Sequence, residues 1–168
     1  QAGYSLLNSA ISKYRGSGVM TIALNNSEGK PAVSAELEAD LELERALSAT
    51  PPEKARIAIE DFLTRNPKHP RVPEARLAAA DAALAVQPPD LSMAKAQLDT
   101  IGADAVATAA LPPSRLALSR LRLTELSGSH AATIEEAKTF LKTYPDDPAA
   151  KDATLTLGLA YFRSESYL

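Results

Sequence analysis

Two proline-punctuated stretches of this chain match at one constant offset, and this repeat constrains the fold more than any other feature. Phe62-Leu63 is followed by prolines at 67 and 70, and Phe140-Leu141 by prolines at 145 and 148. A degenerate copy between them carries Ala94, Leu98 and Ile101. Two units of about 39 residues fill the offset, and periods in this range indicate a solenoid, in which each unit buries its apolar side only against its neighbours.

Apolar residues recur at helical spacing between the prolines and glycines. Alanine, the best helix former, occurs 32 times, whereas aromatic residues are only 5% of the chain. The sequence therefore predicts an all-α fold built from antiparallel helix pairs. The predicted helices cover residues 34–49, 50–65, 72–86, 91–101, 114–126, 133–144 and 149–163.

The predicted helices differ in how they pack. Residues 72–86 are apolar nearly all round, which predicts burial on more than one side. Residues 36–44 alternate acids with leucines, which favours a solvated acidic face on a helix packed through Leu37, Leu41 and Leu43. The spacing of Glu53 after Thr50, and of Glu136 after Thr133, predicts that both threonines cap helices.

The repeat begins near residue 34, so we divide the chain there. Residues 1–33 are predicted to form an N-terminal helix at 4–14 and a flexible loop at 15–31, where three glycines and an Asn-Asn-Ser cluster break the pattern. Residues 34–168 are predicted to form an array of about three units, with the middle one degenerate and the last one incomplete.

The last unit resembles a tetratricopeptide repeat. Its segment 140–148 reads Phe-Leu-Lys-Thr-Tyr-Pro-Asp-Asp-Pro, and Gly158, Tyr161 and Tyr167 match the small and aromatic positions that follow in the family pattern. This sequence pattern is similar to that of tetratricopeptide-repeat proteins of the bacterial envelope, namely outer-membrane assembly lipoproteins and Tol–Pal-associated proteins. The resemblance implies a right-handed superhelical stack of helix pairs whose inner face binds peptides or proteins, in the periplasm or at the envelope.

Composition and charge argue against several classes of protein. The net charge of −3 argues against nucleic-acid binding, which relies on Lys and Arg. The chain contains no run of 18 apolar residues, the length needed to span a bilayer. It also contains no cysteine for disulfides or thiol chemistry. His69 and His130 have no second ligand at helical spacing and are predicted to be exposed loop histidines. We therefore expect no enzyme, no metal and no cofactor.

Three arginines in one predicted helix are the candidate partner-binding residues. Arg115 and Arg122 are seven residues apart and so lie on one face, and Arg120 adds to the local positive charge. If this helix lines the inner groove, the three could bind carboxylates of a partner. The alternative is an outward face that neutralises the acidic helix.

Two functions remain open from the sequence. The first is a non-catalytic scaffold that binds a peptide or a partner protein in an envelope complex. The second is a structural spacer or an oligomerisation segment of a longer repeat protein, in which copies of the chain could pair. Tyr167 favours the second, because it matches an aromatic that would open a further helix.

Overall fold

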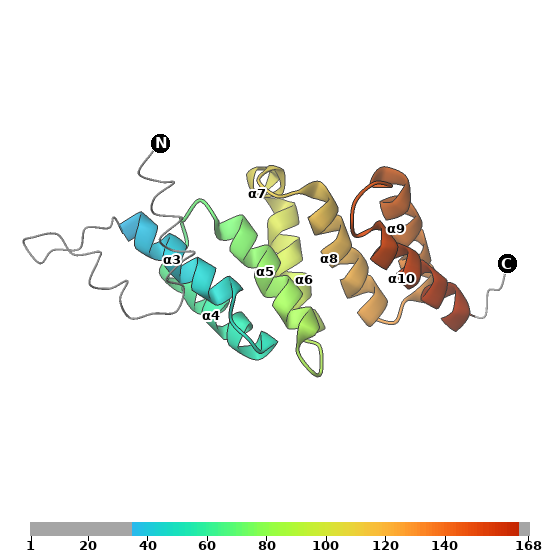
Figure 1. Ribbon diagram of the computed structural model, residues 1–168, viewed down its shortest axis with the longest axis horizontal. Helices are drawn as coiled ribbons and strands as arrows, with labels where there is room; N and C mark the ends of the chain where they lie inside the picture. Colours follow the sequence, from blue (N-terminus) through green and yellow to red (C-terminus); the bar gives the residue numbers. More distant parts are fainter. Residues whose placement is uncertain (1–34, 165–168) are drawn as a thin grey trace, which may run out of the picture. The chain divides into compact units, whose positions relative to one another are not determined.

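A computed structural model describes residues 35–164, and within this range it contains eight helices and no strand (Figure 1). The all-α prediction is confirmed. The predicted helix at 4–14, the loop at 15–31, the boundary at 33/34 and Tyr167 lie outside the described residues. The helices are α3 (Ala35–Leu47), α4 (Pro52–Arg65), α5 (Val72–Ala85), α6 (Leu91–Ala103), α7 (Ala105–Ala109), α8 (Pro113–Leu126), α9 (His130–Thr143) and α10 (Ala150–Arg163).

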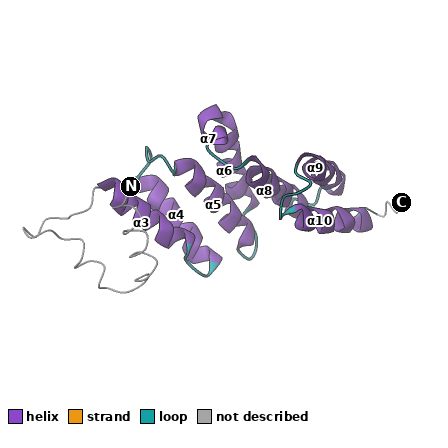
Figure 2. Cartoon of the chain, turned by 45° about the horizontal axis from the view of Figure 1, so that its top comes forward, coloured by secondary structure: helices purple, strands orange, loops and turns teal. Residues whose placement is uncertain are grey.

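The chain divides into two compact units, Gln1–Leu41 and Glu42–Leu168. In the first unit, the described residues are the start of α3. In the second unit, helices that are consecutive in the chain pack on one another: α4 on α5, α5 on α6, α8 on α9 and α9 on α10 (Figures 1 and 2). Helix α8 also contacts α5 and α6.

The helix bounds follow the period of the sequence. Helices α4, α6 and α9 begin at Pro52, Leu91 and His130, which are evenly spaced along the chain by one repeat unit. Helices α9 and α10 occupy the ranges of α4 and α5 shifted by two units, the same offset that relates Phe62 to Phe140. The short helix α7 lies between α6 and α8. The equivalent segments one unit before and after it, between α4 and α5 and between α9 and α10, contain no helix. Positions two units apart can therefore be compared as structural equivalents.

Helix α8 contributes to two apolar clusters. On one side, Leu116 joins the cluster formed by α5 and α6, which includes Leu77, Leu98 and Ile101. On the other side, Leu121 joins the cluster of α9 and α10, which includes Ala137, Phe140 and Ala153. A helix that is buried from two sides fixes its register against both neighbours, so α8 places the side chains between them with little freedom.

The buried residues of α4 and α6 recur at helical spacing, and those of α6 are the three residues of the degenerate copy. In α4 the buried residues are Ala55, Ile59 and Phe62, and in α6 they are Ala94, Leu98 and Ile101. Helix α5 is buried on more than one side, as its nearly continuous apolar sequence predicts. Its buried residues are Ala75, Leu77, Ala78, Ala79, Ala80, Ala83 and Leu84.

The two predicted threonine caps are wrong. Helix α4 begins after Pro51, whose carbonyl accepts the Lys54 amide at 2.9 Å, and Thr50 makes no cap. Helix α9 begins at His130, three residues before Thr133, so this threonine is buried inside the helix. Its hydroxyl donates to the Ser129 carbonyl at 2.9 Å. A capping side chain and a helical back-bonding side chain share the same local sequence, and packing decided between them.

The acidic face of α3 is only partly solvated. Glu36 and Glu38 are exposed, as predicted. Glu42, however, forms an ion pair with Arg65, and Glu44 forms one with Arg71 at 2.8 Å. The second half of the acidic run therefore neutralises basic side chains at the end of α4 and in the loop after it, contacts that helical periodicity cannot reveal.

Candidate functional site

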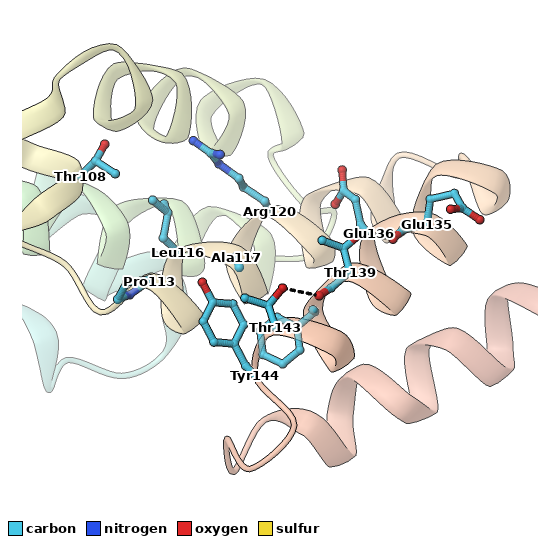
Figure 3. A pocket seen from close by; sticks show the side chains of 11 residues that line it. Thr108, Pro113, Leu116, Ala117, Arg120, Glu135, Glu136, Thr139, Thr143 and Tyr144 are labelled. Atoms are coloured by element: carbon cyan, nitrogen blue, oxygen red, sulfur yellow. Dashed lines mark hydrogen bonds between the residues drawn. The ribbon is translucent and has the colours of Figure 1, made fainter.

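A pocket of about 530 Å³ with mixed chemistry is formed mainly by α8 and α9 (Figure 3). Helix α8 contributes its first two turns, and α9 contributes the side that continues into the loop at Tyr144. Thr108 of α7 completes the wall. The residues that line it are Thr108, Pro113, Leu116, Ala117, Arg120, Glu135, Glu136, Thr139, Phe140, Thr143 and Tyr144.

One wall of the pocket is aromatic. The rings of Phe140 and Tyr144 lie 5.2 Å apart between centroids and are tilted by 56°. Phe140 is fixed by the core, where it is only 3% exposed, and Tyr144 follows α9 directly, with its amide bonded to the Phe140 carbonyl. A rigid aromatic surface beside the aliphatic side chain of Leu116 suits an apolar side chain of a ligand.

Among the residues that line the pocket, Arg120 carries the positive charge. Its side chain extends from α8 toward α6 (Figure 3). A Cβ atom added at Gly102 of α6 would lie 2.8 Å from Nη2 of Arg120. The absence of a side chain at Gly102 therefore leaves room for the guanidinium. Arg120 makes no hydrogen bond or ion pair with the residues that the structure describes. Of the two acids in the pocket, Glu135 pairs with Lys138 at 3.2 Å.

The other acid, Glu136, accepts a hydrogen bond from the Thr124 hydroxyl at 3.1 Å. Both carboxylates in the pocket are therefore engaged with neighbours, while the guanidinium has no such neighbour among the described residues. An arginine of this kind offers a planar set of donors to a carboxylate. The pocket thus combines an apolar wall with a single available cationic group.

In the first copy of the repeat, the residue equivalent to Arg120 is engaged by neighbouring side chains of the same copy. Glu42 stands two units before Arg120, and it forms an ion pair with Arg65 and accepts a hydrogen bond from Asn66 at 3.3 Å. The equivalents of these two partners in the last copy are Thr143 and Tyr144. The polar contact that joins α3 to the end of α4 therefore has no equivalent between α8 and α9, where Arg120 extends toward α6 and the aromatic wall lines another part of the same pocket.

The other two predicted site residues lie elsewhere. Arg115 and Arg122 are both placed beside Asp81 of α5, Arg115 with a nitrogen 3.8 Å from its carboxylate and Arg122 in a smaller pocket that Asp81 also lines. Their predicted position on one face is consistent with this arrangement. Arg120 points away from both, because five residues turn a helix by roughly 140° relative to Arg115. The three arginines do not form one binding surface.

Asp81 lies in the contact between α5 and α8. The hydroxyl of Ser119, which is only 2% exposed, donates to its carboxylate at 2.6 Å. Burial raises the pKa of Asp81 above its ordinary value, and the hydrogen bond from Ser119 and the charges of Arg115 and Arg122 only partly oppose that rise. Desolvation of the carboxylate outweighs its three favourable contacts.

This raised pKa has a predictable effect on stability. Because the folded state holds the Asp81 proton more tightly than the unfolded state, this proton stabilises the fold at low pH, and the stabilisation is lost as pH rises through the folded pKa. We expect the free energy of unfolding of the unmodified protein to increase relative to that of Asp81→Asn as pH falls from about 7 to 4, measured by urea denaturation.

Asp90→Asn is the matched control for this measurement. The backbone amide of Met93, followed by the Ser92 hydroxyl, lowers the pKa of Asp90, so its contribution is lost as pH falls. The unmodified protein should therefore lose stability relative to Asp90→Asn as pH falls below about 4, through the lowered pKa of this carboxyl. Equal pH profiles for the two variants would contradict the assignment of opposite shifts.

The histidines are not the exposed loop residues that the sequence predicts. His69 is half-buried, with its ring edge on Phe62 at a centroid distance of 5.5 Å, and His130 is the partly buried first residue of α9. The aromatic ring of Phe62 lies under the loop that carries His69, and this packing withdraws the histidine from solvent. Among residues 35–164, no group of three His, Asp or Glu side chains is placed to hold a metal ion.

No family model, curated protein or solved structure matches this chain. The resemblance to tetratricopeptide repeats therefore rests on the sequence alone, namely on residues 140–148, Gly158, Tyr161 and Tyr167, and stays an expectation. None of the described helices is both long and apolar enough to cross a bilayer. Sequence reasoning selected Arg120 but missed Gly102 and the aromatic wall. Phe140 and Tyr144 are four residues apart at a helix end, a spacing that could have indicated a shared face.

Proposed function

We propose that this chain is a non-catalytic protein-interaction scaffold whose pocket between α8 and α9 binds a peptide segment of a partner. The observation that carries the proposal is the available guanidinium of Arg120 in the same pocket as the aromatic wall. The preferred segment has an Asp or Glu, which Arg120 would bind, beside an aliphatic or aromatic side chain that would pack on Phe140 and Tyr144.

The proposal includes the architecture and location implied by the resemblance. The helix pairs would wind into a right-handed superhelix of the tetratricopeptide type, and the scaffold would act in a bacterial envelope complex. The packing of consecutive helices and the even spacing of α4, α6 and α9 support the first part. The envelope location is supported only by the sequence pattern of residues 140–148. Fractionation of cells that produce the protein would test it.

The binding proposal is tested with immobilised peptides that place one acid beside Leu, Phe or Tyr, each paired with a copy in which the acid is an amide. We expect the protein to retain acidic members, and Arg120→Gln to lower their affinity at least ~10-fold, because the acid of the peptide loses its charge-assisted hydrogen bonds to the guanidinium. Arg122→Gln, on the same helix but beside Asp81, is the control and should bind as the unmodified protein does.

Gly102→Ala gives a second variant that keeps the arginine. The added Cβ would displace the guanidinium from its place against α6, so affinity should fall although the charge is retained. Equal retention of acidic and amide peptides, or full binding by Arg120→Gln, would refute the role of this pocket. Circular dichroism of each variant would show that the helices are intact.

A specific observation also favours the second function, an oligomerisation segment. Helix α10 exposes Leu155, Leu159 and Phe162. None of these three side chains lines the pocket, so binding of a peptide and pairing of copies would use different residues.

A further inference from the structure

One side of α10 carries an exposed apolar stripe. Leu155, Leu159 and Phe162 are 63%, 37% and 65% exposed, and their spacing of four and three residues places them on one side of the helix. The other large hydrophobic residues that are exposed in the described part of the chain, Ile57, Val106 and Leu126, lie singly on α4, α7 and α8. Scattered residues of this kind are ordinary, whereas a stripe indicates a contact surface.

Gly158 lies within this stripe. A Cβ built at this glycine would meet no atom within 4 Å, so nothing in the described chain occupies the space above it. A glycine in the middle of a helix lowers helix stability by roughly 0.5–1 kcal/mol relative to alanine. Its lack of a side chain lets the backbone of another helix come close to α10 at this point.

The first copy of the repeat shows what kind of group covers this side. The equivalents of Leu155, Gly158 and Phe162 are Leu77, Ala80 and Leu84 of α5, which are 1%, 0% and 8% exposed. They are covered in the cluster that contains Ala94, Leu98 and Ile101, the apolar stripe of α6. Where the chain covers this side, it does so with a helix that presents aliphatic side chains at helical spacing.

One difference between the two copies makes the side of α10 more apolar. The equivalent of Leu159 is Asp81, whose carboxylate needs Ser119 and Arg115 of α8. With leucine at this position, the stripe on α10 needs no polar partner. Another helix with a continuous apolar stripe would therefore cover the stripe on α10. Among the described helices, the one that exposes such a stripe is α10 itself, so a second copy of α10 is a suitable partner.

We infer that two copies of this chain pair through α10, with the two α10 helices antiparallel and Gly158 close to the two-fold axis. Such a contact is self-complementary: Leu155 of one copy faces Phe162 of the other. Charge favours the antiparallel direction. Asp152 and Arg163 are eleven residues apart, hence on the same edge, and the antiparallel arrangement brings each Asp152 near the Arg163 of the other copy. Arg163 also lies 3.7 Å from Glu125 of α8, so Asp152 would add a second carboxylate to this guanidinium.

The pairing is tested by the mass of the purified chain as a function of concentration, by analytical ultracentrifugation. We expect the mass to rise from 17.8 kDa toward twice that value. Leu155→Glu and Leu159→Glu should each raise the dissociation constant at least ~10-fold, because each would place a charge in an apolar contact. Ile57→Glu, an exposed apolar residue on α4, is the matched control and should leave the dimer unchanged.

A mass of 17.8 kDa at all concentrations would overturn the inference. So would a dimer that Leu155→Glu and Leu159→Glu leave intact, because the contact would then lie elsewhere. In either case, binding of a labelled peptide with the sequence of residues 91–103, abolished by Leu155→Glu, would identify a different helix as the occupant of this side. None of these readouts depends on the pocket between α8 and α9, so either proposal can fail without the other.

The direction of pairing has its own measurement, because the chain contains no cysteine. Asp152→Cys and Arg163→Cys variants, one of them carrying a tag, are mixed and oxidised. Antiparallel helices should give mainly the mixed disulfide-linked dimer. Predominance of two unmixed dimers would show parallel helices and overturn the antiparallel arrangement.

Discussion

Replacing Phe62 by alanine is expected to lower the free energy of unfolding by about 3–5 kcal/mol. Phe62 is 0% exposed and lies in α4, where its ring also supports His69. The substitution removes a large apolar side chain from water-free surroundings and leaves a cavity that α4 and α5 can fill only in part. A domain of this size is stable by about 5–15 kcal/mol, so the loss is a large fraction of the total.

The chain provides a control of the same chemistry. Phe162 is 65% exposed on α10, and Phe162→Ala is expected to change the free energy of unfolding by about 0.5 kcal/mol or less. Both variants would be compared by urea denaturation at a low protein concentration, so that pairing of copies does not contribute. Equal losses for the two variants would contradict the placement of Phe62 in the core.

Replacing Ala80 by glutamine is expected to lower the free energy of unfolding by at least about 2 kcal/mol. Ala80 is 0% exposed within the cluster of α5, α6 and α8. The longer side chain would push the helices apart, and its amide would be buried without hydrogen-bond partners. Both effects act against the folded state.

The same substitution at the equivalent position should have the opposite sign. Gly158 has open space above it, so Gly158→Gln introduces no clash and replaces glycine with a better helix former. We expect a gain of roughly 0.5–1 kcal/mol in the free energy of unfolding at low protein concentration. A loss at both positions would show that α10 is covered as α5 is, and would contradict the exposed stripe.

The pocket and the apolar stripe use different surfaces of the last helix pair. The pocket draws on α9 and α8, whereas the stripe lies on α10. Lys138 connects the two helices, since its amine lies 5.6 Å from the centre of the Tyr161 ring on α10 and pairs with Glu135 of the pocket. Tyr161, followed by Glu135, raises the pKa of Lys138 above its ordinary value.

Arg120 illustrates how far the sequence could reach toward the candidate site. Its charge and its helix were predictable, and so was the separation of Arg115 and Arg122 by two helical turns. Its availability was not, because this depends on which side chains of α9 stand opposite it. In the first copy the opposing residues complete an ion pair with Glu42, and in the last copy they do not.

The sequence by itself determined the helices, the phase of their repeat and most of their buried sides, because these depend on local propensity and on apolar spacing along one chain. It could not decide the start of α9, the burial of His69, the ion pairs of Glu42 and Glu44, or the separation of Arg120 from Asp81. Those features arise from contacts between residues that are far apart in sequence, and only the packing of neighbouring helices brings them together. The match between the first and last copies was read from the sequence, while the tertiary structure showed that the two copies differ in which sides are covered.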